Sequence, residues 1–231
     1  MMIKKLFPII SIGLLLSTTA AQAEQNTTER LLGISQYVLD SFSLKKQDAQ
    51  ENFIRFGAHM TGVSLAEARA SFLKEKPEIP PSTRDVVREG FLSAFEKKDY
   101  PILEPAIEQY MNVQSELISS CKAEKTYTQP TTDSFLVPVT CSLPKMDWDH
   151  LQQPTVNDKI SDAQNFVIQL NWLAKKLKDT PPQPLKTHIL IENQDGLFVA
   201  NPDHPDYFPD RVTRELAGSP PDEEIEESIE N

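Results

Sequence analysis

Glycine is scarce in this chain, with only 7 glycines among 231 residues. Phosphate-binding loops of nucleotide enzymes need several closely spaced glycines, because the backbone has to approach the phosphate groups. No serine lies in a G-x-S-x-G element, in which many hydrolases hold their nucleophile. We therefore predict neither a nucleotide-binding enzyme nor a hydrolase of that type.

Metal-binding residues and positive charge are also in short supply. The two cysteines and four histidines are scattered, and no two histidines have the i, i+4 spacing of a zinc-binding helix. Lys and Arg number 23 against 34 Asp and Glu, which gives a formal net charge of -11. Phosphate groups are normally met by basic surfaces, so this balance excludes a nucleic-acid-binding role. We expect no cofactor.

The first 23 residues have the three parts of a secretory signal peptide. Lys4-Lys5 precede an apolar run over Leu6–Leu16, and Ala21-Gln22-Ala23 supplies the small residues of a cleavage site. The run is shorter than the roughly 20 apolar residues that a membrane span needs, so we predict no stable membrane anchor. We expect cleavage after Ala23, a mature chain that begins at Glu24, and a location in the periplasm or outside the cell. An uncleaved anchor is the alternative.

The two cysteines are predicted to form one structural disulfide. The turn-prone segment Pro130-Thr131-Thr132-Asp133 lies midway between them. A hairpin folded about Thr131 places three residue pairs opposite each other on one apolar face, namely Cys121 with Cys141, Ala123 with Val139 and Tyr127 with Phe135. A redox-active pair is the alternative, but catalytic dithiols usually lie two residues apart at a helix start.

Helical spacing of apolar residues dominates the first half of the chain. Ser64 with Glu67 and Ser82 with Asp85 resemble capping boxes, which start helices. Gly62 and Pro77 follow two of the apolar stripes, as residues that end helices do. We predict helices over 26–42, 49–62, 64–76, 82–95 and, as a short helix, 104–111.

Alternating patterns dominate from about Val113 to Pro209 and predict an antiparallel sheet. Leu185–Glu192 and Leu197–Ala200 are predicted strands, joined by the turn residues Asn193-Gln194-Asp195-Gly196. Phe166–Lys176 fits both a strand and a helix, and we favour the strand. The expected fold class is α+β, with N-terminal helices packed on a curved antiparallel sheet.

Composition divides the chain into a signal peptide (1–23), an N-terminal helical region (24–82), an α+β sheet domain (83–210) and an acidic tail (211–231). Six carboxylates lie within Asp222–Glu230. Such a block is usually a disordered, solvated end, and recruitment of a partner is the alternative. Without the signal peptide and this tail, the remaining body carries only about -8.

The segment Val87–Tyr100 (VREGFLSAFEKKDY) resembles the opening helix and turn of nuclear-transport-factor-2-like domains. The closing hairpin over Leu185–Ala200 also resembles the end of that family, and the likeness extends over about residues 83–208. The resemblance implies a curved sheet wrapped around helices that leaves a conical apolar pocket. It implies no single chemistry, because such folds hold both enzymes and binding modules.

The apolar faces of the expected sheet supply the candidate pocket residues, which are Leu117, Tyr127, Phe135, Val137, Phe166, Ile168, Leu170 and Trp172. We expect an exported, non-enzymatic binding module for a lipid, a hydrophobic small molecule or a peptide. One alternative is an accessory or inhibitor component of the bacterial envelope, whose acidic surface and tail engage a basic protein. The other is a pocket enzyme that uses general acid/base catalysis, with Tyr127 as the best-placed phenol. The oligomeric state is open.

The acidic segment after the last predicted strand is a candidate calcium site, because hard cations bind carboxylate and amide oxygens. Its candidate ligands are Asn201, Asp203 and Asp206. The several prolines in this segment favour the alternative, an extended surface loop that covers the sheet edge. A second acidic group, Asp147-Trp148-Asp149-His150, is a weaker candidate.

Overall fold

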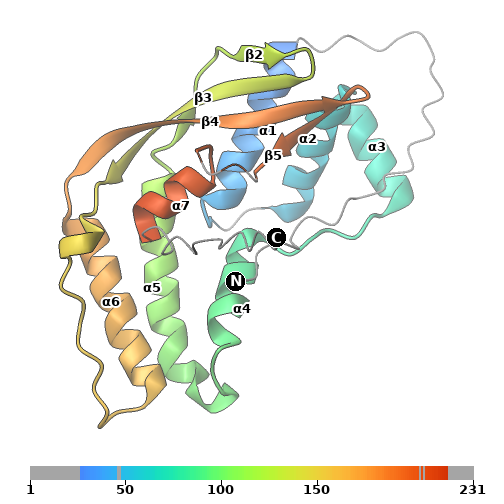
Figure 1. Cartoon of the computed structure of the whole chain (residues 1–231). Coiled ribbons are helices and arrows are strands. Elements are labelled where there is room, and N and C mark those ends of the chain that lie inside the picture. The colour runs from blue at the N-terminus through green and yellow to red at the C-terminus, as the bar shows by residue number, and fades with distance from the viewer. Residues whose placement is uncertain (1–26, 46–47, 203, 205, 218–231) are drawn as a thin grey trace, which may run out of the picture.

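Seven α-helices, five strands and two short 3-10 turns form the part of the chain that the computed structural model describes, residues 27–45, 48–202, 204 and 206–217 (Figure 1). The helices are α1 (Thr27–Phe42), α2 (Ala49–Thr61), α3 (Leu65–Glu75), α4 (Thr83–Leu92), α5 (Tyr100–Ile118), α6 (Asp162–Asp179) and α7 (Asp210–Ala217). The strands are β1 (Lys122–Ala123), β2 (Thr128–Thr131), β3 (Ser134–Pro144), β4 (Pro182–Gln194) and β5 (Leu197–Asn201).

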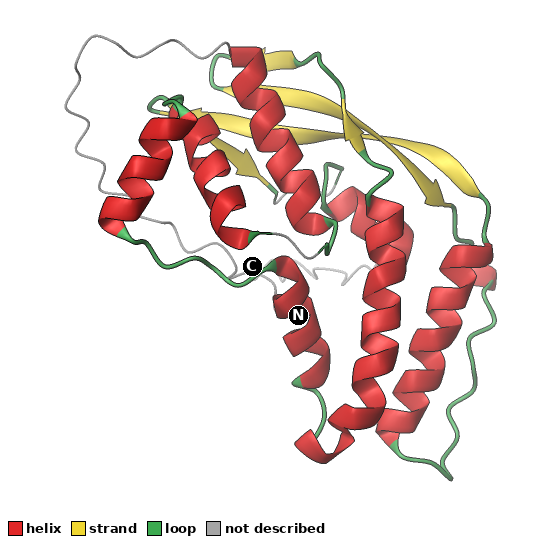
Figure 2. Ribbon diagram, turned by 180° about the vertical axis from the view of Figure 1, so that it is seen from behind, coloured by secondary structure: helices red, strands yellow, loops and turns green. Residues whose placement is uncertain are grey.

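The strands form one curved antiparallel sheet in the order β1-β3-β4-β5, and β2 pairs with the other half of β3 (Figure 1). Strand β3 pairs with β4 over its whole length, from Ser134 opposite Glu192 to Pro144 opposite Pro182. Asp195 and Gly196 form the β4–β5 turn with positive φ values, as its sequence predicts. The helices lie on one side of this sheet (Figures 1 and 2).

One hydrophobic core joins the helices to the inner face of the sheet. Ile34 of α1, Ile107 of α5 and Ile191 of β4 are 0 % exposed, and Val139 of β3 joins them in the same cluster. Residues before and after position 82 contribute to this core. The predicted fold class, α+β with N-terminal helices on a curved antiparallel sheet, is confirmed.

The disulfide joins Cys121 to Cys141 with an S–S distance of 2.03 Å. Ala123 pairs with Val139 in the sheet, and the Tyr127 ring contacts the Phe135 ring at 5.7 Å between centroids. All three predicted residue pairs of this hairpin are therefore present. The disulfide connects the end of α5 and the start of β1 to the centre of the long strand β3.

The predicted sheet begins too early in the sequence, because Val113 and Leu117 belong to helix α5. Buried residues recur every three or four positions from Leu103 to Met111, which is a helical period. Pro101 stands in the first turn, where a proline is favourable to a helix. The predicted short helix over 104–111 is therefore the middle part of a 19-residue helix.

The strand predicted for Phe166–Lys176 is wrong, because these residues lie within helix α6. A capping box starts the helix, in which Ser161 accepts from Gln164 and the Gln164 side chain bonds back to the Ser161 backbone. The buried residues Leu170, Ala174 and Leu177 continue a helical stripe past the segment where strand and helix patterns coincide.

The predicted disordered tail starts too early, because residues 211–217 belong to helix α7. Val212 and Leu216, one helical turn apart, are 2 % and 1 % exposed. The Trp148 indole nitrogen donates to the Glu215 carbonyl oxygen at 3.4 Å and connects α7 to the segment after β3.

The signal-peptide prediction and the acidic block over 222–230 lie outside the described residues. None of the described helices has the length and apolar content that crossing a membrane requires.

Replacement of both cysteines by alanine is expected to lower the free energy of unfolding by about 3 kcal/mol, because the disulfide restricts the unfolded chain across a 20-residue separation. Urea denaturation of the double variant measures the change, with the reduced natural chain as the matched control. Equal unfolding midpoints for oxidised and reduced natural chain would contradict a stabilising role.

Candidate functional site

The residues predicted to line a pocket lie on different elements. Phe135 and Val137 are on β3 in the core, whereas Phe166, Ile168, Leu170 and Trp172 are on α6, and Leu117 is on α5. Ile168 is 47 % exposed and Tyr127 is 36 % exposed, whereas Val137 is 1 % exposed. The structure therefore brings Tyr127 and Phe135 together, but does not gather the predicted set on one apolar face. Binding of a ligand by these residues stays a prediction.

The candidate metal ligands have protein partners or lie outside the described residues. The Asn201 amide donates to the Glu192 carboxylate at 3.1 Å, and the Asp206 carboxylate lies 3.7 Å from the Arg214 guanidinium. Asp203 is outside the described residues. Within the described ranges, no group of three or more His, Cys, Asp and Glu side chains has an arrangement that could hold a metal ion.

Helix α3 exposes apolar side chains along one of its sides. None of its residues, Leu65–Glu75, is buried. Leu73 is 60 % exposed and Leu65 is 37 % exposed. The spacing of Leu65, Ala66, Arg69, Ala70 and Leu73 places them on one stripe of the helix, and all five are exposed. We call this stripe the α3 outer face.

Local sequence signals explain why α3 forms without deep burial. Ser64 and Glu67 form the predicted capping box, in which the serine oxygen accepts from the Glu67 amide and the Glu67 carboxylate accepts from the Ser64 amide. Hydrogen bonds from Ser64 lower the pKa of Glu67. Lys76 closes the other end in the left-handed region. These caps satisfy backbone groups that would otherwise have no partner.

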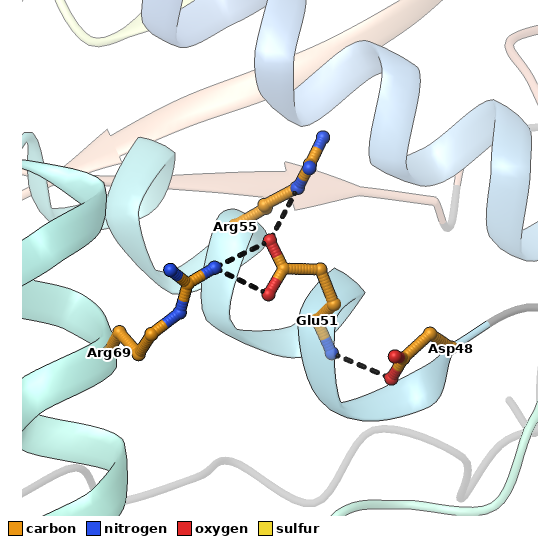
Figure 3. A network of polar contacts seen from close by, with 4 residues as sticks. All are labelled: Asp48, Glu51, Arg55 and Arg69. Carbon is orange, nitrogen blue, oxygen red and sulfur yellow. Dashed lines mark hydrogen bonds and ion pairs between the residues drawn. The ribbon is translucent and has the colours of Figure 1, made fainter.

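The side of α3 that carries Phe72 rests on α2, and Arg69 reaches the same helix from the edge of the outer face. The Phe53 and Phe72 rings meet at 6.0 Å between centroids. The Arg69 guanidinium donates to both Glu51 carboxylate oxygens, at 2.9 and 2.7 Å, and Arg55 donates to the same carboxylate at 2.9 Å (Figure 3). These hydrogen bonds, from Arg55 first and then from Arg69, lower the pKa of Glu51. The carboxylate therefore stays ionised and joins the two helices at neutral pH.

Arg30 of α1 anchors α2 to the body of the protein. Its guanidinium donates to the carbonyl oxygens of His59 at 3.0 Å and Met60 at 2.5 Å, in the last turn of α2. It also donates to the Gly196 carbonyl oxygen at 3.0 Å and lies 3.9 Å from the centre of the Phe198 ring. A cation is favourable at a helix C-terminus, where carbonyl groups lack helical partners. One side chain thus joins α1, α2 and the β4–β5 hairpin.

The contact between α1 and α2 is close because of two glycines. A Cβ atom at Gly33 would lie 2.3 Å from the His59 ring, so no larger residue fits there without a shift of the helices. Gly62 ends α2 with φ of +75°, and a Cβ there would lie 3.2 Å from the Arg30 guanidinium carbon. Tyr37 and Phe56 stack at 4.0 Å between centroids across the same pair of helices. Helix α2, on which α3 packs, is therefore held closely against α1.

The geometry of the α3 outer face suits contact with another apolar surface, because the hairpin holds this face outward from the body. The sequence pattern does not single out this face, because Leu65 also fits one apolar stripe with Ala68 and Phe72. The signal is nevertheless present, since Ala66, Ala70 and Leu73 form a second apolar stripe on the other side of the same helix.

Acidification is expected to destabilise the protein through His59. Burial, together with Arg30 and Arg55, lowers the pKa of His59 from 6.5 and outweighs the opposite effect of Glu29, and the Nδ1 atom has no hydrogen-bond partner among the described residues. The unfolded chain then takes up a proton near pH 6.5, whereas the folded chain does so only at lower pH. The free energy of unfolding therefore falls as the pH drops below about 6.5, and this fall ends below the folded-state pKa.

Urea denaturation at pH 7.5 and 5.5 of the natural chain and of the His59→Phe variant measures this effect. The variant is expected to lose less stability between the two pH values. His150→Gln is the matched control, because this histidine is exposed and its pKa is raised by its hydrogen bond to Asp147. The control should fall at least as steeply as the natural chain. Equal slopes for His59→Phe and the natural chain would contradict the role of His59.

Comparison with known proteins gives few matches. The sequence matches no protein family, and no curated protein matches it. A similar solved structure is that of a candidate lipoprotein from Bacillus subtilis, with 15 % sequence identity and a TM-score of 0.37 over 78 % of this chain. The match spans about half of that protein, 53 % of its length. The resemblance to nuclear-transport-factor-2-like domains stays a prediction.

Proposed function

We propose that this chain is an exported, non-enzymatic protein-interaction module whose docking surface is the α3 outer face. The observation that carries this proposal is an ordered, capped helix whose outward apolar stripe no described part of the chain covers. A stripe of small residues between two leucines lets another helix or an apolar groove approach closely. Such a surface costs free energy in water unless a partner covers it.

The contacts that hold α3 in place support the proposal. The Glu51–Arg69 ion pair and the Phe53–Phe72 contact fix α3 on α2. Arg30 of α1 in turn joins α2 to α1 and to the sheet. A rigid docking element loses little conformational entropy when it binds. The hairpin can therefore use most of its apolar contact for affinity.

Prolines disfavour the other common mode of partner recognition, the addition of a β-strand, at two stretches of the sheet. Pro130 interrupts β2, and Pro182 and Pro184 stand at the start of β4. Proline has no N–H to donate to an incoming strand. These prolines make β2 and the start of β4 poor sites for strand addition.

Export is supported by two independent observations. The first 23 residues have the pattern of a signal peptide. The Cys121–Cys141 disulfide is compatible with an extracytoplasmic location, since disulfides persist in oxidising compartments. We infer that the partner is met in the periplasm or outside the cell.

A second candidate function is the predicted binding of a lipid or hydrophobic small molecule. The observation that favours it is an aromatic cluster in which the Phe166 ring lies 5.8 Å from Phe91 and 5.1 Å from Phe95, with all three side chains partly exposed. Mass spectrometry of natively purified protein is expected to detect a co-purifying apolar molecule that Phe95→Ser reduces. Its absence from the natural chain would remove this candidate.

Site-specific photo-crosslinking in the source organism tests the protein-interaction proposal. A photo-crosslinking residue at Leu73 is expected to give a protein adduct, because Leu73 is the most exposed apolar residue of the α3 outer face. The same crosslinking residue at Ile102, which is 44 % exposed on α5, is the matched control. Equal adducts at both positions, or none, would overturn the proposal.

A truncation after residue 217 keeps α7 and removes the acidic block, so it tests the predicted role of the tail separately.

A further inference from the structure

The α3 outer face is complementary to itself, and we infer that a second copy of this chain occupies it in an antiparallel arrangement. This inference rests on the proposed function, because it names the partner of the same surface. The complementarity has a geometric part, in the positions of the small and large side chains, and an electrostatic part, in the charges along one flank of the helix.

The side-chain sizes fit an antiparallel pair with a twofold axis level with the boundary between Ala70 and Ser71. In that arrangement, Leu73 of each copy lies level with the gap between Ala66 and Ala70 of the other copy. A leucine that inserts between two alanines is the knob-into-hole contact of closely packed helices. The more exposed of the two leucines thus meets the alanines of the face.

The charges select the antiparallel orientation. Glu67 and Lys74 are seven residues apart, or nearly two turns, so they lie on the same flank of α3, near opposite ends. The twofold axis brings Glu67 of one copy level with Lys74 of the other, twice in the dimer. Hydrogen bonds from Ser64 lower the pKa of Glu67 and keep this carboxylate ionised. In a parallel pair, Glu67 would instead lie level with Glu67 of the other copy, and Lys74 with the other Lys74.

The remaining charge on the face already has a partner within its own chain. Arg69 lies at the α2 side of the stripe, close to the level of the twofold axis. Both carboxylate oxygens of Glu51 accept hydrogen bonds from it in each copy, and the same carboxylate also accepts from Arg55 (Figure 3). The desolvated guanidinium therefore keeps its partner in the dimer, which a buried charge requires.

The net charge of the chain also favours contact through this hairpin. Residues 48–76 contain four acidic residues, at 48, 51, 67 and 75, and four basic residues, at 55, 69, 74 and 76, so their formal net charge is zero. The whole chain carries -11. Two copies of an acidic protein repel each other least where the surface is neutral. The α2–α3 hairpin is such a place.

The interface is small, and this sets the expected affinity. Helix α3 has 11 residues and is about 16 Å long. A single helix pair of this length buries less surface than a stable dimer interface, so the association is weak and reversible. We expect a dissociation constant on the order of 100 µM.

Sedimentation equilibrium of the mature chain from 10 µM to 1 mM measures the association. Leu73→Glu is expected to abolish it, whereas the matched control Ile102→Glu leaves it unchanged. A monomer at every concentration, or equal association for Leu73→Glu and the natural chain, would overturn the inference.

Charge exchange tests the orientation. Glu67→Lys and Lys74→Glu are each expected to weaken self-association roughly tenfold, because each creates two like-charge contacts in its homodimer. An equimolar mixture of the two variants is expected to associate as the natural chain does, since both contacts then join opposite charges. Glu67→Lys also removes the capping box of α3, which could weaken association by itself. That effect would persist in the mixture, because Lys74→Glu in one chain does not repair the cap of another chain. A mixture as weak as its components would overturn the antiparallel arrangement.

The crosslinking experiment separates this inference from the proposed function. An adduct at Leu73 with the mass of two copies supports self-association. An adduct with a different protein, together with a monomer in sedimentation, overturns self-association and leaves the proposed function standing. Equal adducts at Leu73 and Ile102 overturn the proposed function itself.

Discussion

The position of the α2–α3 hairpin depends on one guanidinium group, that of Arg30. It donates to the last carbonyl groups of α2 and to the turn of the β4–β5 hairpin. It also lies over the Phe198 ring. Helix ends leave carbonyl groups without partners, and a cation placed there satisfies them and the helix dipole together. Because α3 packs on α2 in turn, the orientation of the α3 outer face relative to the sheet follows from this junction.

Three of the five glycines that the structure describes lie at this junction. Gly33 lets the His59 ring lie directly on α1, Gly62 ends α2 beside Arg30, and Gly196 supplies both the turn and an acceptor for Arg30. Each has a separate physical reason, since close approach requires the first and positive φ values require the other two. The chain has too few glycines for phosphate-binding loops, but these three lie where two helices and a hairpin come close together.

Local signals account for the parts of the fold that the sequence predicts well. The Cys121–Cys141 hairpin has its turn residues midway, and the capping box at Ser64 places the start of α3. Prediction fails where two periods coincide, as at Phe166–Leu170, because a short apolar run fits strand and helix equally. It also fails at α7, whose Val212 and Leu216 are covered by residues distant in the sequence. The α3 outer face was missed for the converse reason, because which of two apolar stripes is covered depends on tertiary packing.

The distribution of charge connects the fold to its proposed role. An acidic surface keeps an exported protein soluble and also opposes contact with acidic neighbours, including its own copies. In the α2–α3 hairpin acidic and basic residues are equal in number, and Glu51 is paired with both Arg55 and Arg69. This balance reduces the long-range repulsion without adding apolar surface, and in the proposed interaction the leucines and alanines of α3 supply the short-range attraction. A helix with no net charge and an exposed leucine–alanine stripe, on an acidic body, would therefore confine the proposed association to one place, and this confinement would make a small interface selective.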